Sequence, residues 1–353
     1  MTRISVAADI GEVDIAFEVA LNVFKLNAHN ADYADIKKYQ WTRDPKFSVG
    51  NFILAWREEK IVGVIRIVDR TIFINGKEIS VAGISSVCVL PAFRGLGISA
   101  ELMDFSIAIA RERGYMVSLL FARRAVDHYY NKFGYYGIAA YSRMKIIIPS
   151  SVVTKKYLEL STFDTNLLSF YNDVYNYSYR LCSGRFKRDI PYWEYLGGII
   201  IATPAITFLT IKIDSIVSGY LVLEDRGIAE LALVENCPAN EVLALIARSG
   251  AIPGGETNTV ELNILPDHSI VKQMQNYDVS FTTRTCFFGG HMIKILKHGS
   301  VNHFLGMSDP QLVNNSDKAS HDFLQTPHLL NITTSFHTAP GSRYFDVSRM
   351  DFF

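Results

Sequence analysis

Residues 87–99 constrain the fold of this chain more than any other segment. Their sequence is VCVLPAFRGLGIS: an alternating apolar strand, then a proline, an arginine and two glycines, with the amphipathic stretch 100–113 directly after them. Glycine adopts backbone conformations that a side chain forbids, so the chain can turn sharply from strand to helix. Amide N–H groups in such a turn converge at the positive end of the helix dipole, and Arg94 adds a permanent positive charge. The segment therefore predicts a strand, a phosphate-binding turn and a helix, as in an α/β fold.

The spacing of this turn excludes the two common nucleotide-binding motifs, because neither GxGxxG nor GxxxxGK[ST] fits it. The turn instead resembles the acyl-CoA motif of the GNAT superfamily of N-acetyltransferases, Gln/Arg-x-x-Gly-x-Gly/Ala after a Val-x-Val-x-Pro strand end. Arg94 and Gly97 match that motif, whereas Ser99 stands where the family has Gly or Ala. If the glycine-rich sequence is considered by itself, the alternative to a ligand-binding turn is an ordinary strand-to-helix turn.

The resemblance implies that this segment binds acyl-CoA or coenzyme A as a co-substrate. In the superfamily the strand that carries Val87 separates from the next strand, and the pantetheine arm lies between them against backbone groups near Val87 and Val89. The N–H of Val89 would donate to the oxyanion that forms during acyl transfer. The implied cofactor-binding residues are Val87, Cys88, Val89, Arg94, Gly95, Leu96, Gly97, Ile98 and Ser99.

A second segment, Tyr130 to Tyr135, follows the expected strand at 116–121 and has the sequence YNKFGY. It is similar to the superfamily signature Tyr-x-x-Phe-Gly-Phe/Tyr. The resemblance implies that Tyr130 points at the thioester sulfur and protonates the departing thiolate, since an unperturbed phenol titrates at about 10 and is protonated at neutral pH. The alternative is that Tyr130 and Phe133 are core aromatics on one helical face.

The chain is long enough for two domains, because 353 residues exceed one hydrophobic core. Residues 1–150 alternate strands and helices and are expected to end with a strand at 144–148. Residues 151–297 repeat that order and are expected to end with two strands near Leu296. The expected fold class is α/β (α+β), with two tandem GNAT-like domains, each a mixed, mostly antiparallel sheet flanked by helices.

The second domain lacks the phosphate-binding turn. Its strand ending at Val234 continues through ENCPAN, with no arginine or glycine at the corresponding positions. We therefore expect residues 1–150 to bind acyl-CoA and catalyse, and residues 151–297 to be a degenerate copy. This arrangement resembles sugar N-acyltransferases of polysaccharide gene clusters and, more distantly, the enhanced intracellular survival family. Residues 298–353 are too short for the third domain of the survival family and are expected to pack near the inter-domain cleft.

Two short aromatic segments carry the same resemblance. The first, WTRDP at 41–45, looks like the Trp-x-x-Asn/Asp-Pro of the sugar-cluster group. The second, RDIPYW at 188–193, resembles an Arg-x-x-x-Tyr-Trp segment found early in the second half of these proteins. We expect Trp41 and Tyr192 to contact the acceptor between the halves, and ordinary core packing of each tryptophan is the alternative.

The sequence does not identify the general base that takes the proton of the amine. The pKa of an amine flanked by sugar oxygens approaches the roughly 8 of an α-amino group, so transfer of its proton through water would suffice. Candidates for direct contact are His29, His128 and the terminal carboxylate of Phe353, which occupies the base position in the survival family. A lone histidine is more often a structural or surface residue.

Composition narrows the possible partners. Lys plus Arg and Asp plus Glu are 35 each, so the chain has no basic field for nucleic acid or an anionic membrane. The four cysteines form no CxxC pair, which argues against zinc or a disulfide framework and for a reducing compartment. No stretch approaches the roughly 20 apolar residues of a membrane span. We expect a cytoplasmic monomer with a small-molecule partner, without metal, nucleic acid or membrane.

These observations predict a CoA-dependent N-acyltransferase that acts on the primary amine of a small polar acceptor. An amino sugar, including a nucleotide-linked one, is the preferred acceptor. Enzymatic alternatives are an aminoglycoside or polyamine acetyltransferase, which would need an acidic acceptor cleft, and a protein lysine acetyltransferase, which would need an exposed peptide groove. The alternative of another class is a module that senses acyl-CoA without turnover.

Overall fold

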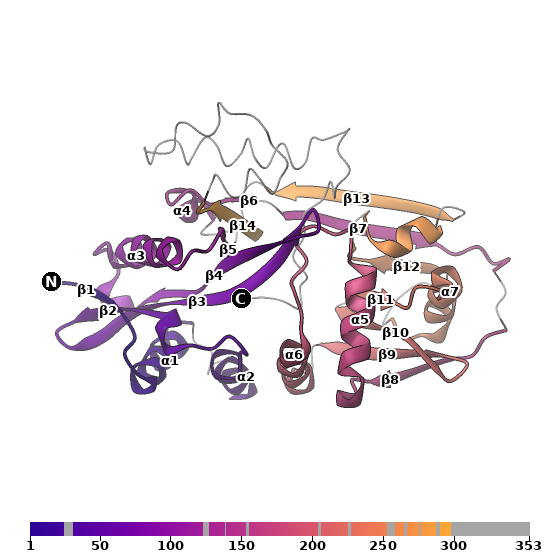
Figure 1. Ribbon diagram of the computed structural model, residues 1–353, viewed down its shortest axis with the longest axis horizontal. Coiled ribbons are helices and arrows are strands. Elements are labelled where there is room, and N and C mark those ends of the chain that lie inside the picture. The colour runs from indigo at the N-terminus through magenta and orange to yellow at the C-terminus, as the bar shows by residue number, and fades with distance from the viewer. Residues whose placement is uncertain are drawn as a thin grey trace, which may run out of the picture.

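The computed structural model describes residues 1–24, 31–122, 127–137, 139–152, 155–203, 206–224, 227–252, 258–264, 267–274, 277–286 and 290–297. Within these ranges the chain forms two seven-stranded mixed sheets that lie side by side, with helices packed on them (Figure 1). The first has the strand order β1-β2-β3-β4-β5-β14-β6, and the second has the order β13-β7-β12-β11-β10-β9-β8. This arrangement confirms the predicted fold class.

The first sheet has apolar cores on both faces. Its strands are β1 (Arg3–Val6), β2 (Phe52–Arg57), β3 (Lys60–Ile74), β4 (Lys77–Val89), β5 (Val117–Ala122), β14 (Gly290–Ile295) and β6 (Tyr136–Gly137). Its helices are α1 (Ile10–Phe24), α2 (Ala31–Thr42), α3 (Ile98–Glu112) and α4 (Asp127–Asn131). Helix α3 covers one face and α1 the other, and the apolar residues of β3 alternate between these two cores. Asn75 and Gly76, with φ of 50° and 75°, form the tight β3–β4 turn that an Asn-Gly dipeptide favours.

The second sheet is built in the same way around α5, α6 and α7. Its strands are β8 (Leu158–Thr162), β9 (Thr207–Ile213), β10 (Ile216–Glu224), β11 (Gly227–Leu233), β12 (Thr259–Leu262), β13 (Asp278–Cys286) and β7 (Ala139–Ile147). Its helices are α5 (Leu168–Ser178), α6 (Ile190–Ala202), α7 (Ala239–Ser249) and the 3-10 helix η5 (Ser269–Met274). Helix α7 packs on one face, and α5 and α6 form an aromatic core on the other.

Two strands cross between the halves. β7 pairs antiparallel with β12 and β13 in the second sheet, and β14 pairs with β5 and β6 in the first. The expectation that a strand at 144–148 closes the first sheet, and that the strand ending near Leu296 closes the second, was therefore wrong. Strand propensity shows that a strand forms, whereas the choice of partner depends on tertiary packing. The sheets accordingly do not divide at residue 150.

The halves also meet along α2, α6 and the far end of β3 (Figure 1). The N–H of Phe73 donates to the carbonyl of Arg185 at 2.9 Å, and the N–H of Gly184 donates back to Phe73 at 2.7 Å. A Cβ at Gly198 would lie 2.0 Å from the Tyr39 hydroxyl, so a larger residue there would force the Tyr39 ring of α2 to move. In the described part of the chain, no helix has both the length and the apolar character that a membrane crossing needs.

Candidate functional site

β4 and β5 are paired over only part of their length. Their parallel register runs from Val81 opposite Val117 to Ile84 opposite Leu120, and β4 continues past it without β5. A bulge follows directly on β4, where two residues, Ser86 and Val87, lie opposite the single residue between Val64 and Arg66 of β3. Ser86 has φ of 56°, and such a bulge bends a strand and increases its twist. The predicted separation of these two strands is present.

The backbone of Val89 faces the side from which β5 has separated. The N–H of Leu90 donates to the carbonyl of Val62 at 2.8 Å, so Leu90 bonds toward β3. Because successive residues of a strand bond to opposite sides, the N–H and carbonyl of Val89 point away from β3. The Nε of Arg94 donates to that Val89 carbonyl at 3.3 Å. The Val89 N–H thus has the direction that an oxyanion donor requires, and its role stays a prediction.

The turn at 94–99 has a backbone that requires glycine. Gly95 and Gly97 both have φ of 79°, in the left-handed region, and a Cβ at either would meet no described atom within 4 Å. Conformation, not crowding, therefore selects glycine at both positions. Gly97 is the N-cap of α3, and its carbonyl accepts from the amides of Ala100 and Glu101 at 2.9 and 3.2 Å. The N–H groups of Ile98 and Ser99 come earlier in the helix than these two bonded amides. They lie at the positive end of the helix dipole and have no acceptor within the helix.

The side chains of this turn differ in what they can offer a ligand. Arg94 and Leu96 are exposed, and Ser99 is half-buried. The side chain of Ile98 is 1% exposed and packs in the core beneath α3, so only its backbone can contact a ligand. On β4, the Cys88 side chain is buried against the core that contains α1, and burial raises the pKa of its thiol to about 12. That thiol is therefore a packing residue and not a nucleophile.

Tyr130 lies on the short helix α4, next to the core under α3. Its half-buried ring contacts the ring of Tyr129 edge to face at 5.2 Å, and burial, with a smaller effect of Tyr129, raises its pKa to about 12. The hydroxyl is thus protonated at neutral pH, as a proton donor must be. The Nδ2 of Asn131 donates to the carbonyl of Tyr135 at 2.8 Å and holds the turn that follows. This placement agrees with both a catalytic and a core role for Tyr130.

Tyr129 is a neighbouring hydroxyl that the sequence analysis did not single out. Its hydroxyl is buried, and burial raises its pKa while the nearby Ser99 side chain opposes that rise. A second tyrosine directly before the signature was the signal that could have pointed to it.

The predicted acceptor residues Trp41 and Tyr192 are both buried. Trp41 is 4% exposed and packs between Phe17 and Phe52, with ring centroids 5.2 and 5.0 Å away. Tyr192 is 5% exposed, and the guanidinium of Arg70 lies 4.9 Å from its ring centroid. Neither ring offers much surface to a substrate, and the two do not form one site. Their predicted contact with the acceptor stays untested.

The structure describes one of the three candidate general bases. His29 and Phe353 lie outside the described residues, and His128 is exposed on α4. Among the described residues, no group of three or more His, Cys, Asp or Glu side chains is arranged to hold a metal ion.

In the second half, the chain itself fills the place of the phosphate-binding turn. The N-cap of α7 is Pro238, which has no N–H, and the first amide of the helix, at Ala239, donates to Oε1 of Gln273 at 3.0 Å. Gln273 belongs to η5, whose Ile270 and Met274 are buried in the same core. That helix terminus therefore has no free Ala239 amide for a pyrophosphate.

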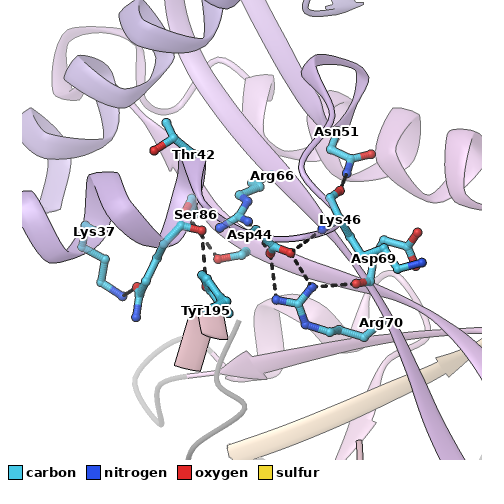
Figure 2. A network of polar contacts seen from close by, with 12 residues as sticks. Lys37, Thr42, Asp44, Lys46, Asn51, Arg66, Asp69, Arg70, Ser86 and Tyr195 are labelled. Atoms are coloured by element: carbon cyan, nitrogen blue, oxygen red, sulfur yellow. Dashed lines mark hydrogen bonds and ion pairs between the residues drawn. The ribbon is translucent and has the colours of Figure 1, made fainter. Parts of the chain in front are cut away.

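The sequence analysis also missed a buried charge cluster on the α2 side of β3. Figure 2 shows the Asp44 carboxylate between Arg66 and Arg70. Oδ2 of Asp44 accepts from Nη2 of both arginines at 2.7 Å, and Oδ1 accepts from Nη1 of Arg70 at 3.0 Å. Burial would raise the pKa of Asp44, but the hydrogen bonds and charges of Arg70 and Arg66 hold it below its usual value. Two arginines four residues apart in a mostly apolar strand, hence on one face, were the available signal.

Comparisons with known proteins agree on one fold. Residues 7–139 match a family model described as acetyltransferase (GNAT) domain. A GCN5-related N-acetyltransferase from Anabaena variabilis is 17% identical over 84% of this chain and 74% of that chain, with a TM-score of 0.61.

Two further solved structures are similar over most of this chain. A probable N-acyltransferase from Enterococcus faecalis, described as a conserved protein of unknown function, is 15% identical over 86% of this chain and 74% of that chain, with a TM-score of 0.62. Eis1 from Mycobacterium abscessus is 14% identical over 86% of this chain and 76% of that chain, with a TM-score of 0.58. At these identities the likeness shows the fold. No curated protein matches the sequence.

Proposed function

We propose that this chain, whose residues 7–139 match a GNAT acetyltransferase domain, transfers an acyl group from acyl-CoA to the primary amine of a small polar acceptor, an amino sugar. The observation that carries the proposal is the combination of an exposed glycine turn at the N-terminus of α3 with the unpaired end of β4. Together these supply donors for a diphosphate and a strand edge for the pantetheine arm.

The residues have distinct roles in this proposal. The amides around Gly97 and Ile98 bind the pyrophosphate, and Arg94 adds its charge. The Val89 N–H donates to the carbonyl oxygen of the thioester as negative charge develops there. Tyr130 donates to the sulfur of the departing thiolate. The amine loses its proton to water or to one of the three candidate bases.

The acceptor class rests on the resemblance of the chain to sugar N-acyltransferases. An aminoglycoside or polyamine acceptor would favour an excess of carboxylates near the bulge of β4, whereas in the described cluster the carboxylate of Asp44 is paired with both Arg66 and Arg70, and Asp69 lies next to Arg70. This charge balance supports an acceptor that is not a polycation. We further propose a monomer in the cytoplasm, where acyl-CoA is available and where the buried thiols of Cys88 and Cys237 stay reduced.

The test is the release of free CoA thiol from acetyl-CoA in the presence of a panel of primary amines. Amine-dependent release, with acetylated amine detected by mass spectrometry, is expected. Tight binding of acetyl-CoA without release for any amine would favour the sensing module. Absence of both binding and release would contradict the proposal as a whole.

A further inference from the structure

Arg66 is a buried cation whose hydrogen-bonding capacity is largely unused. A guanidinium has five N–H donors. The side chain of Arg66 is 5% exposed, and in the described part of the chain it makes one hydrogen bond, from Nη2 to Oδ2 of Asp44 at 2.7 Å. A buried donor without an acceptor costs free energy, so native structures usually supply a partner, water or an ion.

Asp44 cannot satisfy the remaining donors of Arg66. Its carboxylate accepts two bonds from Arg70, one from Arg66 and one from the Lys46 N–H at 3.0 Å. These use the roughly four lone-pair sites that a carboxylate has. Arg70 is held by both Asp44 oxygens and donates from Nη1 to the Asp69 carbonyl. Among the described residues, Arg70 thus makes three hydrogen bonds, although its Nε is buried without a partner, whereas Arg66 makes one.

The position of Arg66 connects it to the proposed reaction. Its Cα partner on β4 is Ser85, the residue directly before the bulge, and Val64 on the same face is the partner of Cys88. The neighbouring Ile65 and Ile67 pack toward α3, so Arg66 lies on the opposite face, where its guanidinium is 6.0 Å from the Phe52 ring centroid. The Arg66 guanidinium therefore lies on the α2 side of the sheet, next to the bulge.

The charges around Arg66 favour an anion. Lys37 on α2 donates to Oε1 of Gln40 at 2.8 Å (Figure 2). Burial together with the charge of Arg66 lowers the pKa of Lys37 to about 8. The Arg66 cluster, defined as Lys37, Asp44, Arg66 and Arg70, therefore contains three basic side chains and one acid. Tyr195 of α6, which lies beside it, has a pKa raised by burial to about 12 and adds no negative charge.

We propose that Arg66, assisted by Lys37, binds an oxyanion of the amine acceptor, a phosphate or a carboxylate. This inference rests on the proposed function and specifies its substrate class as anionic amines. The planar guanidinium fork matches both oxyanions in a two-point contact. The same positive charge repels polyamines and aminoglycosides, so the cluster also selects against cationic acceptors.

The test compares kcat/KM for four amines in the thiol-release assay at fixed acetyl-CoA. Glucosamine is the reference, glucosamine 6-phosphate carries a phosphate, 2-amino-2-deoxyglucuronic acid carries a carboxylate, and spermidine is a polycation. We expect at least one of the two anionic amines to exceed glucosamine and spermidine to be the poorest substrate. Arg66→Gln should lower the preference for the anionic amine over glucosamine by about 10- to 100-fold, the effect of losing hydrogen bonds to a charged group.

Two further variants keep the test decisive. Lys37→Met, on the half-buried face of α2, should reduce the same preference and replaces Arg66→Gln if the latter does not fold. Arg185→Gln removes a guanidinium of similar burial at the other end of β3 and should leave the preference unchanged. Release from all amines with no preference for the anion, or a preference that survives both cluster variants, would overturn the inference and leave the proposed function intact. No release with any amine would overturn the proposed function itself.

Discussion

Replacing Tyr130 with phenylalanine isolates the hydroxyl that we assign to the leaving thiolate. The ring contacts with Tyr129 and Tyr135 are kept, and the described residues include no hydrogen-bond partner of the Tyr130 hydroxyl whose loss would destabilise the fold. The variant should therefore unfold at the same urea concentration as the wild type, within about 0.5 kcal/mol.

The size of the kinetic effect follows from the raised pKa. Burial raises the pKa of Tyr130 to about 12, whereas a thiol titrates at roughly 8.5. Complete proton transfer to the thiolate is therefore uphill, and the hydroxyl acts mainly as a hydrogen-bond donor to the developing charge. Such a bond is worth about 1.5–3 kcal/mol, so kcat should fall roughly 10- to 150-fold. Because the phenol stays neutral below its pKa, Tyr130 should cause no loss of kcat in the wild type up to pH 10.

Steady-state kinetics with acetyl-CoA and the best amine provide the assay, and Tyr129→Phe provides the matched control. The Tyr129 hydroxyl lies next to the Ser99 side chain and has no assigned role at the thiolate, so its removal should change kcat less than about 3-fold. The KM for acetyl-CoA should be similar in both variants. Unchanged turnover in Tyr130→Phe, or an equal loss in Tyr129→Phe, would refute the assignment.

Three other substitutions test the packing that surrounds the site. Trp41→Ala should cost about 3–5 kcal/mol of unfolding free energy, because the ring is 4% exposed; an unchanged urea midpoint with a raised acceptor KM would instead support the predicted contact with the acceptor. Asp44→Asn should cost about 3–5 kcal/mol, measured by thermal unfolding, because it leaves Arg66 and Arg70 buried without a counter-charge; an unchanged Tm would contradict this pairing. Gln273→Ala should lower stability by about 1 kcal/mol without changing the CoA stoichiometry, and a second CoA per chain would show that this side chain blocks a binding site.

The glycine turn could be predicted because its geometry is determined by consecutive residues. The left-handed conformations at Gly95 and Gly97 and the start of α3 follow from local chemistry, and the structure has all three. The same holds for the order of strands and helices, which reflects local periodicity.

The rest depends on contacts between distant segments. β7 and β14 are recognisable as strands, but their exchange between the sheets is decided by packing partners that sequence patterns do not specify. Arg66 and Asp44 are 22 residues apart, and Ala239 and Gln273 are 34 residues apart. For Trp41, core packing and contact with a substrate would leave the same sequence pattern.

Titration calorimetry of CoA with Gly97→Ala, compared with Gly76→Ala, tests the assignment of the phosphate-binding turn most directly. Both glycines have a positive φ and open space around the missing Cβ, and Gly76 lies in the β3–β4 turn, outside the predicted turn at 94–99. A left-handed conformation costs an L-residue about 1–2 kcal/mol, so we expect the free Gly97→Ala turn to leave this conformation. Restoring it on binding should weaken CoA binding by roughly 10-fold. Gly76→Ala should bind one CoA per chain with the affinity of the wild type. Equal affinity in both variants, or no binding by the folded wild-type protein, would contradict the assignment.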